Sequence, residues 1–463
     1  MKIRTVKLIN IMIFFLISCN CGLEKVNIVG IWEGKIKFPG IETRIVFNIK
    51  SLQSGKLEAE MLKPDEHDNV LKVNSITLRD SNLYIEVTTL NGSFNGHIKP
   101  NNEIIAGQWK QGRLLQKLVL HKVTKIVKYA RPQTPIPPYP YNVKEVSFLN
   151  KEENIHLSGT ITWPNKSSSI PAVILIPGGG AHDRDYSILR HRPFHVIADY
   201  LTKKGVAVLR FDERGVGLSN GDRSKATCDN YSQDVLAGVR FLKTFSGFSI
   251  NSISLIGHSE GGMIASVSAV KSKEVSFIVL LGSPGLSGEE YQYQFEETTG
   301  RAMGLSEEMV ESKRAIQEKV FDVLLHEHDQ NLAKTKIRNI YKKFYPQIPE
   351  GKIRASAARF LSPGFQYNLA YDPASTLHKV QCPVFAIYGE KDLHVPPEGN
   401  FLAMKHILEG RSDILYKVIT LPGLNHFFQN AADKEPFEYG KIEETISPNV
   451  LELIGDWICE FKE

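Results

Sequence analysis

Six short apolar runs, separated by segments of helix-forming sequence, place the strongest constraint on how this chain folds. Each run has four or five residues, and an unbroken apolar run of that length is typical of a strand buried on both faces of a sheet. Helix-like segments such as 194–203 and 231–244 lie between the runs. Strands that alternate with helices predict a doubly wound, mostly parallel α/β sheet. The runs are residues 172–176, 206–210, 253–256, 277–281, 384–388 and 416–420.

One interval between these strands is far longer than the others. About a hundred residues separate Leu281 from Val384, and residues 289–358 are rich in helix formers. Compact domains rarely contain a structureless loop of that length. We therefore expect a helical cap inserted over the sheet at about residues 286–375, within a domain that spans residues 141–463.

The N-terminal part of the chain has the pattern of short strands. Alternating apolar and polar residues and frequent turn sequences predict a separate antiparallel β domain over residues 27–125, either a barrel or a sandwich. Gly30-Ile31-Trp32 resembles the start of lipocalin-like barrels, but the motif is short, and we favour a structural or docking module over a ligand-binding barrel. The clearest alternating segments are residues 43–49, 83–87 and 94–98.

A proline-rich segment separates the two regions. Five prolines lie within residues 131–140. They exclude a helix or a central strand and favour an extended, semi-rigid spacer. We therefore predict a linker over residues 126–140.

The chain begins with a basic stretch followed by an apolar run at residues 8–17. This is the pattern of a secretory signal peptide, and the run is too short for a comfortable membrane span. It ends in Leu16-Ile17-Ser18-Cys19, which resembles the lipobox of bacterial lipoproteins. The resemblance implies a signal peptide over residues 1–18, a diacylglycerol on Cys19 and a bilayer as partner. The protein is then expected in the cell envelope, facing the periplasm or the surface; an ordinary signal peptide with an incidental Cys is the alternative.

Charge and cysteine content argue against two other classes of protein. The formal net charge is +5, and about +2 remains once the three basic residues of the predicted signal peptide are removed. Because the basic residues are also scattered, we expect no nucleic-acid partner. Cys21, Cys228, Cys382 and Cys459 have no metal-type spacing, so we expect mostly free thiols. We expect no metal and no organic cofactor.

The sharpest local motif is Gly257-His258-Ser259-Glu260-Gly261-Gly262. It lies between an apolar run and a helix-like segment. A Gly-x-Ser-x-Gly motif placed between a strand and a helix is typical of a nucleophile elbow. The tight turn strains the backbone of the Ser, and its crowding requires flanking residues without side chains. The helix N-terminus offers backbone N–H groups to a developing oxyanion. We therefore predict that Ser259 is a catalytic nucleophile.

A Ser hydroxyl needs a base to become nucleophilic. Asp392 follows the apolar run 384–388, and His426 follows the later run 416–420. The resulting order Ser, Asp, His is that of hydrolases with a nucleophile elbow. We predict that His426 is the general base and that Asp392 orients it, with Glu390 as the alternative acid.

The glycine-rich loop after the run 172–176 predicts the rest of an oxyanion hole. Glycines let the backbone approach a carbonyl oxygen closely. We expect one donor N–H from Gly179 or Gly180 and the other from Glu260. The carboxylate of Glu260 is expected to repel anionic substrates or to attract a cationic group.

Four motifs together resemble those of bacterial α/β-hydrolase esterases over roughly residues 141–463. The resemblance implies hydrolysis of a small-molecule carboxylic ester through an acyl-enzyme. It implies Ser259, Asp392 and His426 as catalytic residues, with Gly179 and Glu260 as oxyanion donors, and a β-rich domain before the hydrolase fold. We expect the second motif to form a rigid turn in which Arg214 pairs with nearby carboxylates or carbonyls. The motifs are residues 177–185, 210–219, 257–262 and 382–383.

Two other functions are weighed against an esterase. A serine peptidase of the prolyl-oligopeptidase kind shares the fold and the triad, but residues 27–125 lack propeller-like repeats. A binding lipoprotein with a catalytically silent hydrolase fold is the second, and the intact Ser, Asp and His argue against it.

Overall fold

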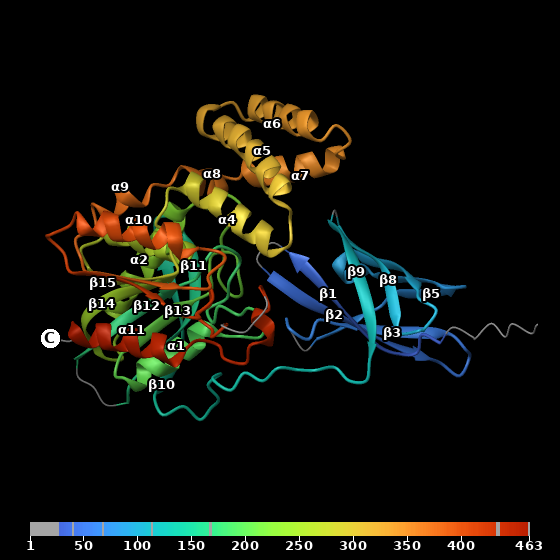
Figure 1. The fold of residues 1–463 in the computed structure, drawn as a ribbon. Helices are drawn as coiled ribbons and strands as arrows, with labels where there is room; N and C mark the ends of the chain where they lie inside the picture. Colours follow the sequence, from blue (N-terminus) through green and yellow to red (C-terminus); the bar gives the residue numbers. More distant parts are fainter. Residues whose placement is uncertain are drawn as a thin grey trace, which may run out of the picture.

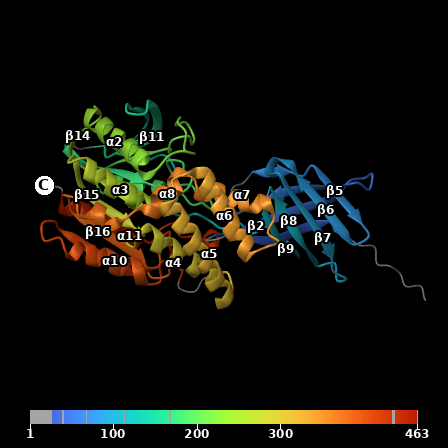
Figure 2. The same ribbon diagram turned by 90° about the horizontal axis from the view of Figure 1, so that it is seen from above.

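The computed structural model describes residues 27–38, 41–66, 69–112, 114–165, 169–431 and 436–461. Two β-sheets organise these residues into an N-terminal β domain and a larger α/β domain with helices above it (Figures 1 and 2). The predicted signal peptide, the predicted lipidation site Cys19 and Cys21 lie outside the described residues. No helix within the described ranges is long and apolar enough to cross a membrane.

The sheet of the larger domain has eight strands in the described part of the chain, in the order β10-β11-β13-β12-β14-β15-β16-β17. β10 and β11 form an antiparallel hairpin, β11 pairs antiparallel with β13, and the remaining neighbours are parallel. The predicted mostly parallel α/β-hydrolase sheet is therefore confirmed. The strands are β10 (Asn142–Asn150), β11 (Ile155–Trp163), β12 (Ser169–Ile176), β13 (Ala207–Phe211), β14 (Ser249–His258), β15 (Val275–Leu281), β16 (Val384–Gly389) and β17 (Tyr416–Leu421).

Helices cover both faces of this sheet, which explains why central strands such as β12, β15 and β16 are apolar and buried. α1 (Pro193–Lys203) and α11 (Pro448–Glu460) pack on one face. α2 (Cys228–Thr244), α3 (Glu260–Lys271) and α10 (Pro397–Glu409) pack on the other. Each face has its own cluster of buried side chains.

Five helices form the predicted cap between β15 and β16 (Figure 1). They have a small apolar core of their own, and α9 (Pro373–Leu377) leads the chain back to the sheet. The side chains of Ser287, Ser306, Asp329 and Ser362 cap four of these helices by accepting backbone N–H groups. The cap helices are α4 (Gly288–Ala302), α5 (Glu307–His326), α6 (Gln330–Phe344), α7 (Glu350–Phe360) and α8 (Pro363–Ala370).

The N-terminal domain is one antiparallel sheet of nine described strands that curls into a half-barrel, rather than a sandwich (Figure 1). Its concave face buries the rings of Trp32, Phe47, Phe94 and Trp109. The strand order is β4-β3-β2-β1-β9-β8-β7-β6-β5. The strands are β1 (Gly30–Phe38), β2 (Ile41–Ser51), β3 (Leu57–Leu62), β4 (Val70–Lys72), β5 (Ser75–Arg79), β6 (Asn82–Val87), β7 (Gly92–Ile98), β8 (Ile104–Gln111) and β9 (Leu114–Val123).

The proline-rich segment lies along the larger domain and is held there by hydrogen bonds. The guanidinium of Arg131 donates to the carbonyls of Leu189 at 3.0 Å and Gly440 at 2.7 Å. The amide of Gln133 donates to the carbonyl of Ile446 at 2.7 Å. These contacts make the segment part of the fold, where the sequence suggested only a spacer.

Candidate active site

Ser259 occupies the turn between β14 and α3 with φ 55° and ψ −123°. This backbone conformation is costly for a residue with a side chain. Positions 257 and 261 on either side have no room for a side chain, so they must be glycine. A Cβ on Gly257 would lie 2.1 Å from the carbonyl oxygen of Gly261, and a Cβ on Gly261 would lie 2.3 Å from the carbonyl oxygen of Ile176. The backbone N–H of Ser259 donates to the carbonyl of Leu281 at 2.8 Å. The turn is therefore a sharp elbow pinned against the sheet.

His426 and Asp392 form a buried pair. The Nδ1 of His426 lies 2.8 Å from Oδ2 of Asp392, while Oδ1 accepts the backbone N–H groups of His394 and Val395, each at 2.8 Å. Glu390, the alternative acid, instead accepts the backbone N–H of Gly423. Burial raises the pKa of Asp392 to about 6 and lowers that of His426 to about 3. At neutral pH the carboxylate is charged and the imidazole is neutral, which is the state that a general base needs.

Two further imidazoles that the sequence reasoning did not single out contact His426. The Nε2–H of His258 donates to the carbonyl of His426 at 2.7 Å, and the hydroxyl of Tyr186 donates to Nδ1 of His258 at 3.0 Å. The ring of His394 stacks on that of His426, with centroids 4.6 Å apart and planes within 7°. His258 lies next to the predicted nucleophile, and His394 lies two residues after the predicted acid. This closeness in sequence was the one signal from which a contact with His426 could have been predicted.

Ser259 and His426 line the same cavity of about 250 Å³. Gly179 and Glu260, the predicted oxyanion donors, also line it. Gly178 lies so close to the nucleophile that a Cβ on it would be 3.0 Å from Cβ of Ser259. Gly180, the alternative donor, is not among the lining residues. The structure thus brings the glycine-rich loop, the elbow and His426 to one place.

The cap supplies one wall of this cavity. Asn368 of α8 donates from Nδ2 to Oε1 of Glu260 at 3.0 Å, and burial raises the pKa of the Glu260 carboxyl. Met263, Leu286, Tyr291 and Phe295 contribute apolar surface. The sequence predicted a cap but carried no signal for which cap residue reaches Glu260.

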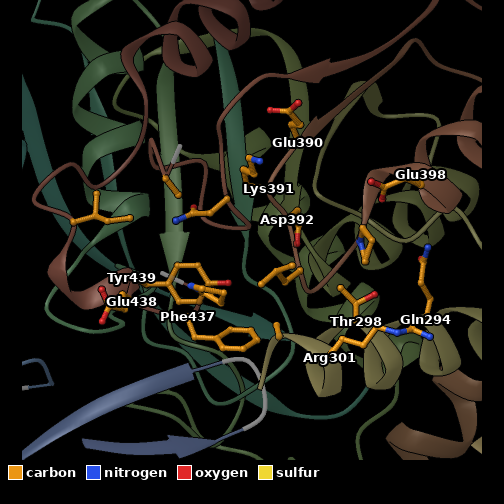
Figure 3. Close-up of a pocket in the computed structure, with 17 residues that line it drawn as sticks. Gln294, Thr298, Arg301, Glu390, Lys391, Asp392, Glu398, Phe437, Glu438 and Tyr439 are labelled. Carbon is orange, nitrogen blue, oxygen red and sulfur yellow. The ribbon is translucent and has the colours of Figure 1, made fainter. Parts of the chain in front are cut away.

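A second cavity, of about 550 Å³, lies on the other side of Asp392 (Figure 3). Its walls come from the cap helix α4, the segment after β16 and residues 436–439. Neither Ser259 nor His426 lines it, so we take the smaller cavity as the candidate active site. The labelled lining residues are Gln294, Thr298, Arg301, Glu390, Lys391, Asp392, Glu398, Phe437, Glu438 and Tyr439.

The second of the four motifs, residues 210–219, forms a structural turn whose residues do not line the cavity of Ser259. Arg214 binds Glu153 at 2.7 Å and Asp234 at 2.8 Å, as expected for a residue that braces the turn. Within the described residues, no group of His, Cys, Asp and Glu side chains is arranged to hold a metal ion. The three cysteines that the structure describes, Cys228, Cys382 and Cys459, are free thiols.

Comparison with known proteins points to hydrolases. Residues 169–430, more than half of the chain, match the family described as serine aminopeptidase, S33. Esterase EstD of Thermotoga maritima is 27% identical over 328 residues, which cover 69% of this chain and 70% of that protein. An uncharacterized 31.7 kDa protein of the traX-finO intergenic region of Escherichia coli is 25% identical over 246 residues, which cover 52% and 78%. The solved esterase Pf2001 of Pyrococcus furiosus has a TM-score of 0.41 and 17% identity, over 72% of this chain and 98% of that one.

Proposed function

The chain belongs to the serine aminopeptidase S33 family of hydrolases, and from that premise we propose that it hydrolyses carboxylic esters through an acyl-enzyme on Ser259. The observation that carries the proposal is the shared cavity: Ser259 and His426 both line it, and His426 is held by Asp392 at 2.8 Å. The similarity to Esterase EstD supports an ester as the substrate.

The proposed mechanism assigns each residue one task. His426 takes the proton of Ser259 as the hydroxyl attacks the ester carbonyl. The backbone N–H groups of Gly179 and Glu260 donate to the oxyanion that forms. His426 then gives the proton to the departing alcohol, and water repeats the sequence to release the acid, while Asp392 keeps the imidazole oriented and supports its positive charge.

A serine peptidase is the second candidate, and the family name favours it. Fold and triad do not separate the two, because both reactions pass through the same acyl-enzyme. The test is turnover of an ester and an amide that share one acyl group and have leaving groups of equal size. We expect the ratio of kcat/KM for the ester to kcat/KM for the amide to exceed the ratio of the uncatalysed hydrolysis rates of the two compounds. A kcat/KM for the amide that equals or exceeds that for the ester would favour the peptidase.

Ser259→Ala tests whether the proposed site is catalytic. We expect turnover to fall by several orders of magnitude, since the nucleophile and its base act as one unit. Labelling with a fluorophosphonate should modify the native chain and not the variant, because only an activated Ser reacts. A native chain that resists labelling would favour the catalytically silent binding protein.

We also propose, from the sequence alone, that Cys19 carries a lipid that anchors the protein in the bacterial envelope. Four residues ending in Cys19 resemble a lipobox, and acyl chains on that residue would hold the protein at a bilayer. Cys19→Ser is expected to release the protein from the membrane fraction, while the neighbouring Cys21→Ser is expected to leave it there. A Cys19→Ser protein that still sediments with membranes would contradict the anchor.

A further inference from the structure

One wall of the active-site cavity presents acceptor oxygens that lack donors. Asn368 gives its amide N–H to Oε1 of Glu260, and its own Oδ1 is buried with no hydrogen-bond partner among the described residues. The amide of Asn368 reaches only Oε1 of Glu260, and no donor among the described residues reaches Oε2. A buried acceptor that stays unpaired costs free energy, and a buried carboxylate costs more.

This wall lies beside the place where the substrate carbonyl is expected. Oε2 of Glu260 is only 2.5 Å from the position of a Cβ built on Gly179, so the carboxyl group lies against the proposed oxyanion loop. Glu260 also directly follows Ser259 in the chain. A group that reaches the wall is therefore close to the scissile carbonyl.

Much of the remaining cavity surface is apolar and differs in this from the Glu260–Asn368 wall. Side chains of Met263, Leu286 and Phe295 line it with apolar surface. Arg223 is the cation that lowers the pKa of Glu260. It is not one of the residues that line the cavity, and its guanidinium donates a hydrogen bond to the carbonyl of Gly180. A small cavity of about 250 Å³ thus places two acceptor oxygens without donors beside apolar side chains.

We propose that the Glu260–Asn368 wall selects acyl groups that carry a hydrogen-bond donor, a hydroxyl or an ammonium, on the third carbon. The proposal rests on the proposed ester hydrolysis and names the substrate class of that site. An ammonium has enough N–H groups to donate to both Oε2 of Glu260 and Oδ1 of Asn368, whereas a hydroxyl would donate its single O–H to one of them. Burial raises the pKa of Glu260 although the Asn368 amide and the charge of Arg223 act to lower it, so a further donor from the substrate would stabilise the charged carboxylate.

Four ethyl esters test the proposal because they differ in one substituent. Butyrate, 3-methylbutyrate, 3-hydroxybutyrate and 3-aminobutyrate share the chain, and the last three also share its branched shape. For the native chain we expect kcat/KM for the hydroxy or the amino ester to exceed that for the methyl ester by about tenfold or more, as a hydrogen bond to a charged acceptor predicts. The better of these two esters identifies the donor.

Two variants test whether the Glu260–Asn368 wall causes the preference for the hydroxy or amino ester. Glu260→Gln and Asn368→Leu are expected to bring that ratio within about threefold, with Glu260→Gln acting most strongly if the donor is an ammonium. Gln366→Leu, on the same helix but outside the cavity lining, should keep the native ratio. Fluorophosphonate labelling of each variant checks that Ser259 is still activated, so that a misfolded variant is recognised.

The outcomes separate this proposal from the proposed function. Equal kcat/KM for the four esters, or a preference for the methyl ester, overturns the donor-selecting wall and leaves ester hydrolysis standing. The same holds if the preference is present but survives both Glu260→Gln and Asn368→Leu. Absence of turnover for all four esters, with labelling intact, contradicts ester hydrolysis, and the proposal falls with it.

Discussion

The imidazole of His426 lies between two other imidazoles. His258 is buried, and burial lowers its pKa to about 3, so it stays neutral while its Nε2–H holds the carbonyl of His426. His394 is half-buried and stacks on the other side. The imidazole of His426 is therefore positioned through its backbone, through Asp392 and through a stacked neighbour.

The pH dependence of activity follows from the buried pair. With the pKa of Asp392 raised to about 6, acidification adds a proton to the Asp392–His426 pair as a unit and removes the charge that supports the imidazolium. We expect kcat/KM for a stable ester to rise through about pH 6 and to level off above it. The measurement is a profile of kcat/KM from about pH 4 to 8; full activity at the acid end would contradict the assignment of the pair.

Substitution of His394 tests the stacked ring. His394→Ala is expected to lower kcat about tenfold, because the imidazole of His426 gains freedom to leave the reactive geometry. The backbone N–H that His394 donates to Asp392 is kept. His394→Phe should restore most of the activity, since it returns a flat ring. If both variants lose activity equally while fluorophosphonate labelling also fails, a general structural role replaces the positioning role.

The elbow between β14 and α3 is the element that brings Ser259 to the cavity. Gly261→Ala is expected to lower the free energy of unfolding by about 1–3 kcal/mol, because the added Cβ meets backbone oxygens that have no room to move. It should also reduce kcat at least about tenfold through displacement of Ser259. Gly351→Ala in α7 is the matched control, because a Cβ there meets nothing within 4 Å. Thermal unfolding of both variants provides the comparison.

Elements of the larger domain were predictable because their patterns are local. The run 172–176 lies within β12, and the seven residues that follow the first Ser of this strand are all buried, as a strand covered on both faces requires. The segment 231–244 falls within α2, where Thr227 forms a capping box with Asn230. Ser259 directly follows β14, and Asp392 and His426 lie in the loops after β16 and β17, so all three were predicted from their places after recognisable strands.

The parts that sequence reasoning missed depend on contacts between distant segments. Asn368 reaches Glu260 across 108 positions of sequence, and no periodicity in a helix tells which of its side chains faces a cavity. The short strand β4 has three residues with little burial, too few for an alternating pattern to be visible. The choice of a half-barrel over a sandwich depends on how far the sheet curls, which local patterns do not encode.

At the scale of the whole molecule, the N-terminal domain contacts residues 436–439, which form one wall of the second cavity, next to the candidate active site. Lys35 of β1 lies 3.0 Å from Glu438 and 3.0 Å from Glu42, and the ends of the first two strands lie below Phe437 and Glu438 (Figure 3). Tyr439 in turn packs against Phe427, with ring centroids 5.1 Å apart. This continuous chain of contacts links the β domain to the residue after His426 and favours the docking role over a ligand-binding barrel.

The contact between the domains is testable through Lys35. Its partners Glu42 and Glu438 are nearly buried, with side-chain exposures of 6% and 12%, so Lys35→Met removes the cation that they share and leaves Lys441 as the cation paired with Glu438. We expect a lower unfolding temperature and a kcat/KM reduced about threefold or more as the wall loosens, whereas Lys35→Arg should retain both. Lys50→Met removes a pair with Glu60 that is exposed on both sides, and such pairs contribute little. If Lys35→Met behaves like Lys50→Met in both measurements, the β domain does not support the active site.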